Sequence, residues 1–149
     1  MLFLLFELDG ERYALDSSQL IEVLPLVDLK PLSRAPQGIA GMFDYHGVPV
    51  PVVDLSEVIL GRAAQRRLNT RIVIVNYPGT DNVPHALGLV AERATATVRL
   101  DPAQFKGSGV SNGETAYLGP VARDAQGLIQ WLAIPKLLPL ALRNVLFQN

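Results

Sequence analysis

The stretch Gly41-Met-Phe-Asp-Tyr-His-Gly-Val-Pro-Val-Pro-Val-Val-Asp-Leu55 carries the clearest structural signal in this chain. Its central dipeptide, His46-Gly47, predicts a tight turn, because glycine adopts positive φ without steric cost. The β-branched valines that follow favour a pleated, half-buried surface. The stretch therefore predicts a β-hairpin, and its second strand runs into a short helical turn that ends at Gly61.

Prolines alternate with valines in the second strand of this hairpin. Pro49 and Pro51 cannot donate to a sheet ladder, so we expect them at an edge or a bulge, on a free face. Val48, Val50 and Val52 are expected to form the opposite face, in the core. A sheet edge kept open beside an exposed turn suits a docking surface better than a catalytic pocket.

Ten short strands are predicted along the chain. Asp9-Gly10 is a strong hairpin signal between the first two strands. Ile72-Val-Ile-Val75 is a continuous β-branched run, typical of a fully buried strand. A spacing of roughly 8–12 residues between strands predicts a sandwich or barrels rather than βαβ units. Besides the central hairpin, which begins at Ile39, the predicted strands are Leu2–Leu8, Glu11–Leu15, Leu20–Pro25, Arg71–Tyr77, His85–Val90, Ala94–Leu100, Thr115–Val121 and Gly127–Ile134.

One helix is predicted, from Pro135 to Phe147. Pro139 fits only within its first turn, because proline lacks the N–H that an inner helical position needs. Four apolar residues fall on one stripe of this helix and predict its buried face: Leu138, Leu142, Val145 and Leu146.

Composition bounds the function. At 149 residues the chain is long enough for one domain with a real core. Hydrophobic residues make up 49% and charged residues 18%, which indicates either a large core or an apolar surface for a partner. The net charge of −1 offers no global field for nucleic acid or anionic lipid. The absence of cysteine excludes disulfides, thiolate nucleophiles and zinc–thiolate sites.

The N-terminal run Met1-Leu-Phe-Leu-Leu-Phe6 superficially resembles a signal-peptide core. It lacks a basic region before it, and Glu7 and Asp9 interrupt it. No stretch approaches the ~18 apolar residues of a transmembrane helix. We therefore expect a buried first strand, a cytoplasmic protein and no direct membrane insertion.

Polar residues around the hairpin predict no catalytic, cofactor or metal site. His46, His85, Asp44 and Asp54 show no short fixed ligand spacing. A hydrolase triad that uses Ser56 is disfavoured as well, because no Gly-x-Ser-x-Gly motif is present.

A basic cluster follows the short helical turn, and it contains Arg62, Arg66, Arg67 and Arg71. Such a run usually forms a solvated face, and no aromatic residues are interleaved to stack on bases. Nucleic-acid binding is not predicted, whereas contact with an acidic partner surface stays open.

Motifs along nearly the whole chain resemble the CheW-like family of chemotaxis coupling proteins. They are Phe6-Glu-Leu-Asp-Gly-Glu-Arg-Tyr-Ala-Leu15, Ile21-Glu-Val-Leu-Pro25, the central Gly41 to Leu55 stretch, Arg71-Ile-Val-Ile-Val75 and Leu87-Gly-Leu-Val-Ala-Glu92. Two later motifs, Tyr117-Leu-Gly-Pro-Val121 and Leu128-Ile-Gln-Trp131, are similar to the branch that serves Wsp-type surface-sensing pathways.

The resemblance implies a mainly β fold of two small five-stranded SH3-like β-barrels that share an apolar core. The C-terminal helix is expected to cap the first barrel, and the whole chain, 1–149, forms one CheW-like domain. The implied function is a non-enzymatic adaptor between the cytoplasmic tip of a methyl-accepting chemoreceptor and the regulatory domain of a CheA-like histidine kinase. One barrel would meet the kinase, and a groove between the barrels would take the receptor. The alternative is a β-barrel that binds a peptide or ligand by strand addition, without a kinase.

The central turn departs from the family pattern, which usually has Arg before the glycine, as in Asn-x-Arg-Gly. Here an imidazole replaces the guanidinium, and we expect His46 to keep a weaker, pH-sensitive contact with Glu22. Phe43 and Tyr45 are the best aromatic anchors, while Gly41 and Gly47 are expected to serve the backbone first. The predicted protein-interaction residues are Glu22, Gly41, Phe43, Asp44, Tyr45, His46, Gly47, Pro49 and Pro51.

Overall fold

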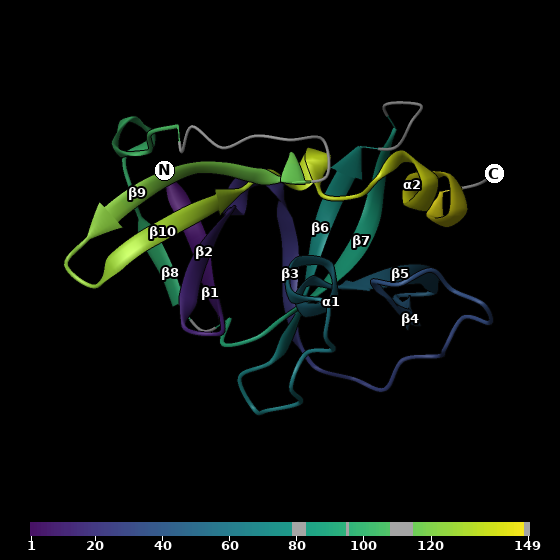
Figure 1. Cartoon of the computed structure of the whole chain (residues 1–149). Helices are drawn as coiled ribbons and strands as arrows, with labels where there is room; N and C mark the ends of the chain where they lie inside the picture. The colour runs from purple at the N-terminus through teal and green to yellow at the C-terminus, as the bar shows by residue number, and fades with distance from the viewer. Residues whose placement is uncertain (79–82, 95, 108–114, 148–149) are drawn as a thin grey trace.

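Two five-stranded sheets lie side by side in this protein (Figure 1). The structure is a computed structural model, and it describes residues 1–149 apart from 79–82, 95, 108–114 and 148–149. The first sheet contains β1 (Leu2–Leu8), β2 (Glu11–Asp16), β8 (Ala96–Arg99), β9 (Leu118–Asp124) and β10 (Gly127–Leu132). The second contains β3 (Leu20–Pro25), β4 (Ile39–Tyr45), β5 (Val48–Asp54), β6 (Arg71–Pro78) and β7 (Pro84–Ala91).

The chain enters the first sheet, builds the second, and then returns to the first. The strand orders are β8-β1-β2-β10-β9 and β3-β6-β7-β5-β4. Each sheet contains one parallel pair, β2 with β10 and β5 with β7, and its other pairs are antiparallel. The predicted mainly β fold with two five-stranded units is confirmed.

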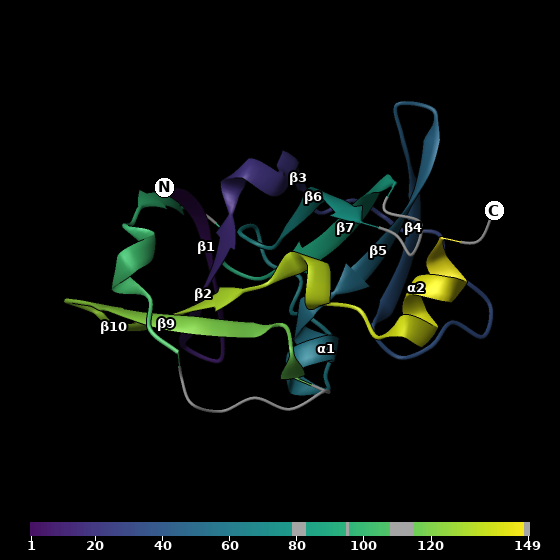
Figure 2. The same cartoon turned by 90° about the horizontal axis from the view of Figure 1, so that it is seen from above.

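Short helices lie between the strands and after the last one. They are the 3-10 turns η1 (Ser17–Gln19), η2 (Pro102–Gln104) and η4 (Ile134–Lys136), and the α-helices α1 (Leu55–Leu60) and α2 (Leu140–Leu146). Asp16 caps η1 through the backbone N–H of Ser18, and Gly61 ends α1 with φ of 78°. Seen from above, α1 lies where the two sheets meet and α2 lies beside the second sheet (Figure 2).

The shared core explains the continuous apolar run of β6. Val73 and Val75 face the large core between the two sheets, whereas Ile72 and Ile74 face a smaller cluster within the second sheet. All four residues are fully buried, because the alternating faces of this strand both meet apolar partners. The predicted buried strand and the predicted shared core are therefore confirmed.

The first sheet closes around an aromatic cluster of its own. Phe3 lies at ring-centroid distances of 5.3 Å from Phe105 and 4.9 Å from Trp131. The two Trp131 contacts, with Phe3 and Phe105, are edge-on, an arrangement that aromatic pairs prefer.

The predicted C-terminal helix is wrong in extent and in position. It divides into η4 and α2, with Pro139 as the cap residue of α2, because the residue before a proline is disfavoured in helical geometry. Val145 is 51% exposed and does not belong to the buried stripe. Phe147 stacks on Tyr77 of β6 and His85 of β7, so α2 packs on the second sheet and does not cap the first barrel.

Two strand predictions also need correction. The predicted strand Thr115–Val121 begins three residues later, at Leu118, because Tyr117 is held in the bend before β9 by the N–H of Ala133. Val48 is 55% exposed rather than part of the core, since β7 pairs with β5 only from Val52 onward.

The same geometry explains the prolines of β5. In a two-residue hairpin, Val48 pairs with Tyr45 next to the turn, so alternate residues direct their N atoms away from β4. Pro49 and Pro51 occupy these outward positions before the pairing with β7 begins. The missing N–H groups therefore cost no ladder hydrogen bond, although β5 is an inner strand of the sheet.

Candidate functional site

The β4–β5 tip, defined here as residues 43–49, is a tight and well-braced turn. His46 has φ of 51° and Gly47 has φ of 84°, so both central residues adopt the positive φ that a two-residue hairpin requires. Asp44 Oδ1 accepts a hydrogen bond of 2.7 Å from the N–H of Gly47. Local chemistry thus fixes the backbone of the tip before any partner is present.

A side-chain hydrogen bond joins the two edge strands of the second sheet. The Tyr45 hydroxyl on β4 donates to Glu22 Oε1 on β3 across 2.6 Å. β3 and β4 stand at opposite ends of the strand order, so this bond spans a seam between them that carries no strand pairing. The hydrogen bond to Glu22 is the main cause of a raised pKa of Tyr45.

His46 stands further from Glu22 than the sequence led us to expect. Its Nε2 lies 4.0 Å from Glu22 Oε1, which allows an ion pair with a protonated imidazole but is too long for a hydrogen bond. The imidazole ring instead lies against Tyr45, with ring centroids 4.4 Å apart. Sequence reasoning missed Tyr45 as the closer partner of Glu22, because nothing in the spacing shows that the two edge strands meet.

The other predicted interaction residues divide into two groups. Asp44, Gly47 and Pro49 are exposed at the tip, and Phe43 is half-buried beside Tyr45 with ring centroids 6.1 Å apart. Gly41 and Pro51 lie further down the hairpin, where Gly41 is buried and Pro51 half-buried.

Gly41 serves the backbone, as expected. Its φ is 147°, and a Cβ atom there would lie 2.6 Å from the carbonyl oxygen of Lys30. Lys30 and Met42 exchange two backbone hydrogen bonds, which cover the outer edge of β4. The glycine therefore permits a close approach of two chain segments rather than a partner contact.

Apolar side chains beside the tip add a surface that sequence reasoning overlooked. Ile21 and Val23 on β3 are 44% and 41% exposed, and Val48 at the tip is 55% exposed. The position of β3 at a sheet edge leaves Ile21 and Val23 in solvent. Val48 pairs with Tyr45 across the hairpin, so these two side chains share one face near the Glu22 carboxylate, whereas Val23 lies on the other face of β3 from Glu22.

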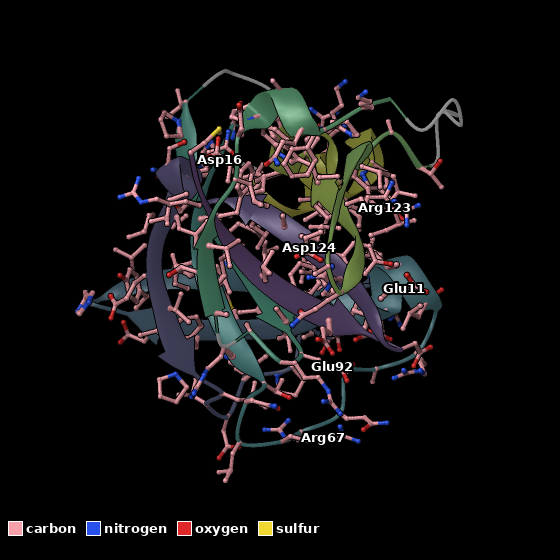
Figure 3. The ribbon with its side chains drawn as sticks, turned by 90° about the vertical axis from the view of Figure 1, so that its left-hand side faces the viewer. Glu11, Asp16, Arg67, Glu92, Arg123 and Asp124 are labelled. Carbon is pink, nitrogen blue, oxygen red and sulfur yellow. The ribbon has the colours of Figure 1, made fainter. Side chains whose placement is uncertain are left out.

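The basic cluster is partly neutralised. Arg62 pairs with Asp9 in the β1–β2 turn, and its Nη1 lies 3.8 Å from Oε2 of the buried Glu92. Arg66 lies 3.6 Å from Asp28 on the surface. Figure 3 views the molecule from the side of the first sheet and shows Arg67 below Glu92. The cluster thus connects chain segments as well as presenting charge.

The polar residues considered for a catalytic triad have structural roles. Asp54 caps α1 by accepting from the N–H groups of Ser56 and Glu57, and its other oxygen accepts from Ala64 at 2.8 Å. Burial is the main cause of the raised pKa of Asp54. The Ser56 hydroxyl donates to Glu92 across 2.6 Å. Within the described ranges, no group of three or more His, Asp or Glu side chains is placed to hold a metal ion.

One further property concerns membranes. In the part of the chain that the structure describes, no helix is both long enough and apolar enough to cross a lipid bilayer.

Two barrel-like sheets around one core, with an exposed aromatic tip, define a small β protein with a surface suited to docking. The profile of the CheW-like domain matches residues 2–141, and the chain belongs to this family. Chemotaxis protein CheW of Klebsiella aerogenes is 27% identical over 97 residues, which covers 61% of this chain and 58% of that relative. The chain thus spans little more than half the length of this relative.

A solved structure shows the same fold. The scaffolding protein TtCheW from Thermoanaerobacter tengcongensis matches with a TM-score of 0.80 at 21% sequence identity. The match covers 93% of this chain and 87% of that protein. The two-barrel architecture is therefore shared over nearly the whole chain.

Proposed function

We propose that this protein is a non-enzymatic cytoplasmic adaptor that couples the tip of a methyl-accepting chemoreceptor to the regulatory domain of a CheA-like histidine kinase. Membership of the CheW-like family supports the class of function. The observation that carries the proposal is the exposed β4–β5 tip, with Tyr45 fixed by its hydrogen bond to Glu22.

The mechanism is geometric. Two surfaces on one rigid body hold receptor and kinase in a fixed relation, so that the receptor can bias the kinase through differential contacts with its conformational states. A tip that is already braced loses little conformational freedom when a partner binds. Rigidity of the tip therefore favours affinity without any chemistry in this chain.

The kinase side is assigned to the β4–β5 tip and the neighbouring face of β3. Tyr45 and Phe43 provide aromatic surface, and Val48, which pairs with Tyr45 and is 55% exposed, extends it with an apolar group. Interface cores are enriched in aromatic residues and poor in charge, which fits this composition.

The receptor side is assigned to a depression where the two sheets meet. It has a volume of about 310 Å³ and is lined by Gln19 of η1, Trp131 of β10 and Ile134 of η4, among others. Its apolar lining suits the apolar stripe of a receptor helix hairpin.

Calorimetric titration with the regulatory domain of a CheA-like kinase from the same genome tests the kinase assignment. We expect micromolar binding that Tyr45→Ala weakens at least about tenfold, as for an interface anchor. Tyr45→Phe separates loss of the hydroxyl from loss of the ring, and His46→Ala reports on the turn itself. Leu128→Ala, at a residue that is 49% exposed on the first sheet, is the matched control.

Three outcomes are distinguishable. Binding that none of the tip variants alters would keep the adaptor and move the tip to the receptor side. Loss of binding to a receptor-tip fragment in Gln19→Lys, with kinase binding intact, would support the two-surface mechanism. No binding to the kinase at high concentration would favour the alternative, a β-barrel that binds a peptide without a kinase.

A further inference from the structure

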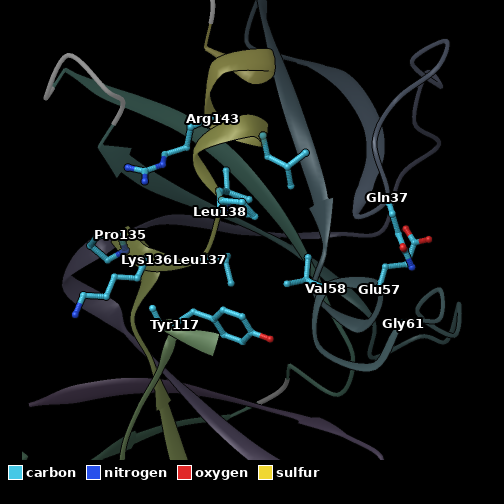
Figure 4. A pocket seen from close by; sticks show the side chains of 13 residues that line it. Gln37, Glu57, Val58, Gly61, Tyr117, Pro135, Lys136, Leu137, Leu138 and Arg143 are labelled. Atoms are coloured by element: carbon cyan, nitrogen blue, oxygen red, sulfur yellow. The ribbon is translucent and has the colours of Figure 1, made fainter. Parts of the chain in front are cut away.

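A second concave site lies away from the β4–β5 tip. It is a groove of about 920 Å³ between α1, η4 and the start of α2 (Figure 4). Its apolar wall consists of Val58, Leu137, Leu138 and Leu142, and none of the predicted interaction residues line it. The volume lies within the ~300–1,000 Å³ of typical small-ligand pockets.

The hydroxyl of a largely buried tyrosine is directed into this groove and open to it. Tyr117 is 7% exposed, and Figure 4 shows its hydroxyl directed into the open space beside Val58. No hydrogen bond joins this hydroxyl to any residue that the structure describes. Burial raises the pKa of Tyr117, so the group stays protonated near neutral pH and can donate. The hydroxyl is open to the groove, so an acceptor atom of a ligand there can receive its hydrogen bond.

Positive charge gathers on one side of the groove. Lys136 and Arg143 both lie toward the left in Figure 4, on either side of Pro135, and neither forms an ion pair with a described carboxylate. The Nε of Arg143 is buried and has no hydrogen-bond acceptor. A buried guanidinium nitrogen without an acceptor is costly, and a carboxylate is its best-matched partner.

The opposite side of the groove carries an acidic and a polar side chain instead of cations. Glu57 and Gln37 lie there, across the apolar wall from the two cations (Figure 4). A ligand that filled the groove would therefore meet a cationic end, an apolar middle and an acidic end. A second anionic group on the ligand would be repelled by Glu57.

We propose that this groove binds a small amphipathic monocarboxylate, with its acidic head at Lys136 and Arg143 and its apolar body on the leucines. The Tyr117 hydroxyl donates a hydrogen bond to the ligand further along the groove. The groove contains none of the β4–β5 tip residues and shares Pro135 with the depression assigned to the receptor, so its ligand is an input to the protein next to that surface.

Calorimetry of the intact protein with decanoate, below its micellar concentration, tests the site. We expect saturable binding that Arg143→Gln weakens about tenfold, as for loss of a charge-assisted hydrogen bond. Tyr117→Phe keeps the ring and should weaken binding about threefold, as for a neutral hydrogen bond. Arg123→Gln, at an exposed arginine on β9, is the matched control and should bind as the parent does.

Ligand analogues and methyl NMR make the result specific. Decanol lacks the charge and decanedioate adds a second one, so both should bind more weakly than decanoate. Decanoate should shift the methyl signals of Leu138 and Leu142 and leave those of Leu128 unchanged. The proposal is overturned by equal binding of decanol, by parent-like binding of Arg143→Gln, or by no saturable binding. An acidic, apolar peptide that occupies the groove where decanoate does not would also overturn it, in favour of a peptide site.

Discussion

The β1–β2 and β4–β5 hairpin turns have the same backbone conformation and differ in their surroundings. Asp9 and Gly10 in the β1–β2 turn have φ of 51° and 78°, against 51° and 84° at His46 and Gly47. Asp9 is held by Arg62, which follows α1 of the second sheet and also approaches Glu92. Among the described residues, the hydrogen bonds and ion pairs of the β4–β5 tip stay within its own hairpin or reach Glu22. The first turn connects the two sheets, and the second is exposed at the end of its hairpin.

The largest expected effect comes from breaking the connecting turn. Arg62→Met leaves the buried Glu92 with the Ser56 hydroxyl as its near partner. Removing one member of a fully buried ion pair lowers the free energy of unfolding by ~3–5 kcal/mol. Because the Arg62 side chain is 39% exposed, we expect a smaller loss. Urea unfolding should show a decrease of about 2 kcal/mol. Arg66→Met, which breaks the exposed pair with Asp28, should cost less than about 0.5 kcal/mol. Equal losses would contradict a connecting role for the β1–β2 turn.

Substitutions of the two turn glycines, Gly10 and Gly47, form a matched pair with an expected effect of intermediate size. Gly10→Ala and Gly47→Ala each place a Cβ in the left-handed region, which costs about 1–2 kcal/mol, and neither Cβ meets another atom. The losses of thermal stability should therefore be similar. Kinase binding by calorimetry should fall for Gly47→Ala only. A similar fall for Gly10→Ala would remove the functional distinction between the turns.

A third hairpin, β9–β10, extends the comparison, because its contribution to stability is expected to depend on pH. Its Asp124 is held by Arg12 of β2, with 2.9 Å between Nη1 and Oδ2, and this contact lowers the pKa of Asp124 to about 2. A lowered pKa stabilises the fold above the ordinary value near 4, and this contribution disappears as the pH falls from about 4 to 2. The effect is small because the Asp124 side chain is 40% exposed.

Unfolding measurements in this acid range check the prediction. Asp124→Asn should lose stability near neutral pH and show a flatter decline than the parent between pH 4 and 2. Parallel declines of the two proteins would mean that the ion pair does not stabilise the hairpin.

The smallest expected effect lies at the β4–β5 tip. Glu22→Gln replaces the charged acceptor of the Tyr45 hydroxyl, so the pKa of Tyr45 should fall toward its ordinary value near 10. Carbon-13 labelling of tyrosine Cζ, with Tyr45→Phe to assign the signal, measures this by NMR titration. Little change in unfolding is expected, because the group is on the surface. An unchanged Tyr45 titration would show that the bond across the seam is absent in solution.

Local sequence predicted most of the secondary structure. The Asp9-Gly10 and His46-Gly47 turns follow from residues that tolerate positive φ, and the buried β6 follows from its run of β-branched residues. Errors arose where packing competes with local preference. The long helix predicted from Pro135 to Phe147 is interrupted at Pro139, and Val48 lies beyond the reach of β7.

The candidate sites were predicted less completely. The residues of the β4–β5 tip were identified, whereas the Tyr45–Glu22 bond and the exposed face of β3 were not. The groove around Tyr117 left no signal in the sequence. Tyr117, Arg143 and Val58 are far apart along the chain and meet only because α1, η4 and α2 converge where the sheets join.

The sequence by itself determined the turns, the strands and the family, because positive φ, β-branching and strand spacing act within a few residues. The tertiary structure decided which turn stays exposed, which carboxylate accepts from Tyr45, and which guanidinium nitrogen is buried without an acceptor. These outcomes depend on contacts between residues distant in sequence. Burial and charge pairing are properties of the packed chain, and local patterns do not encode them.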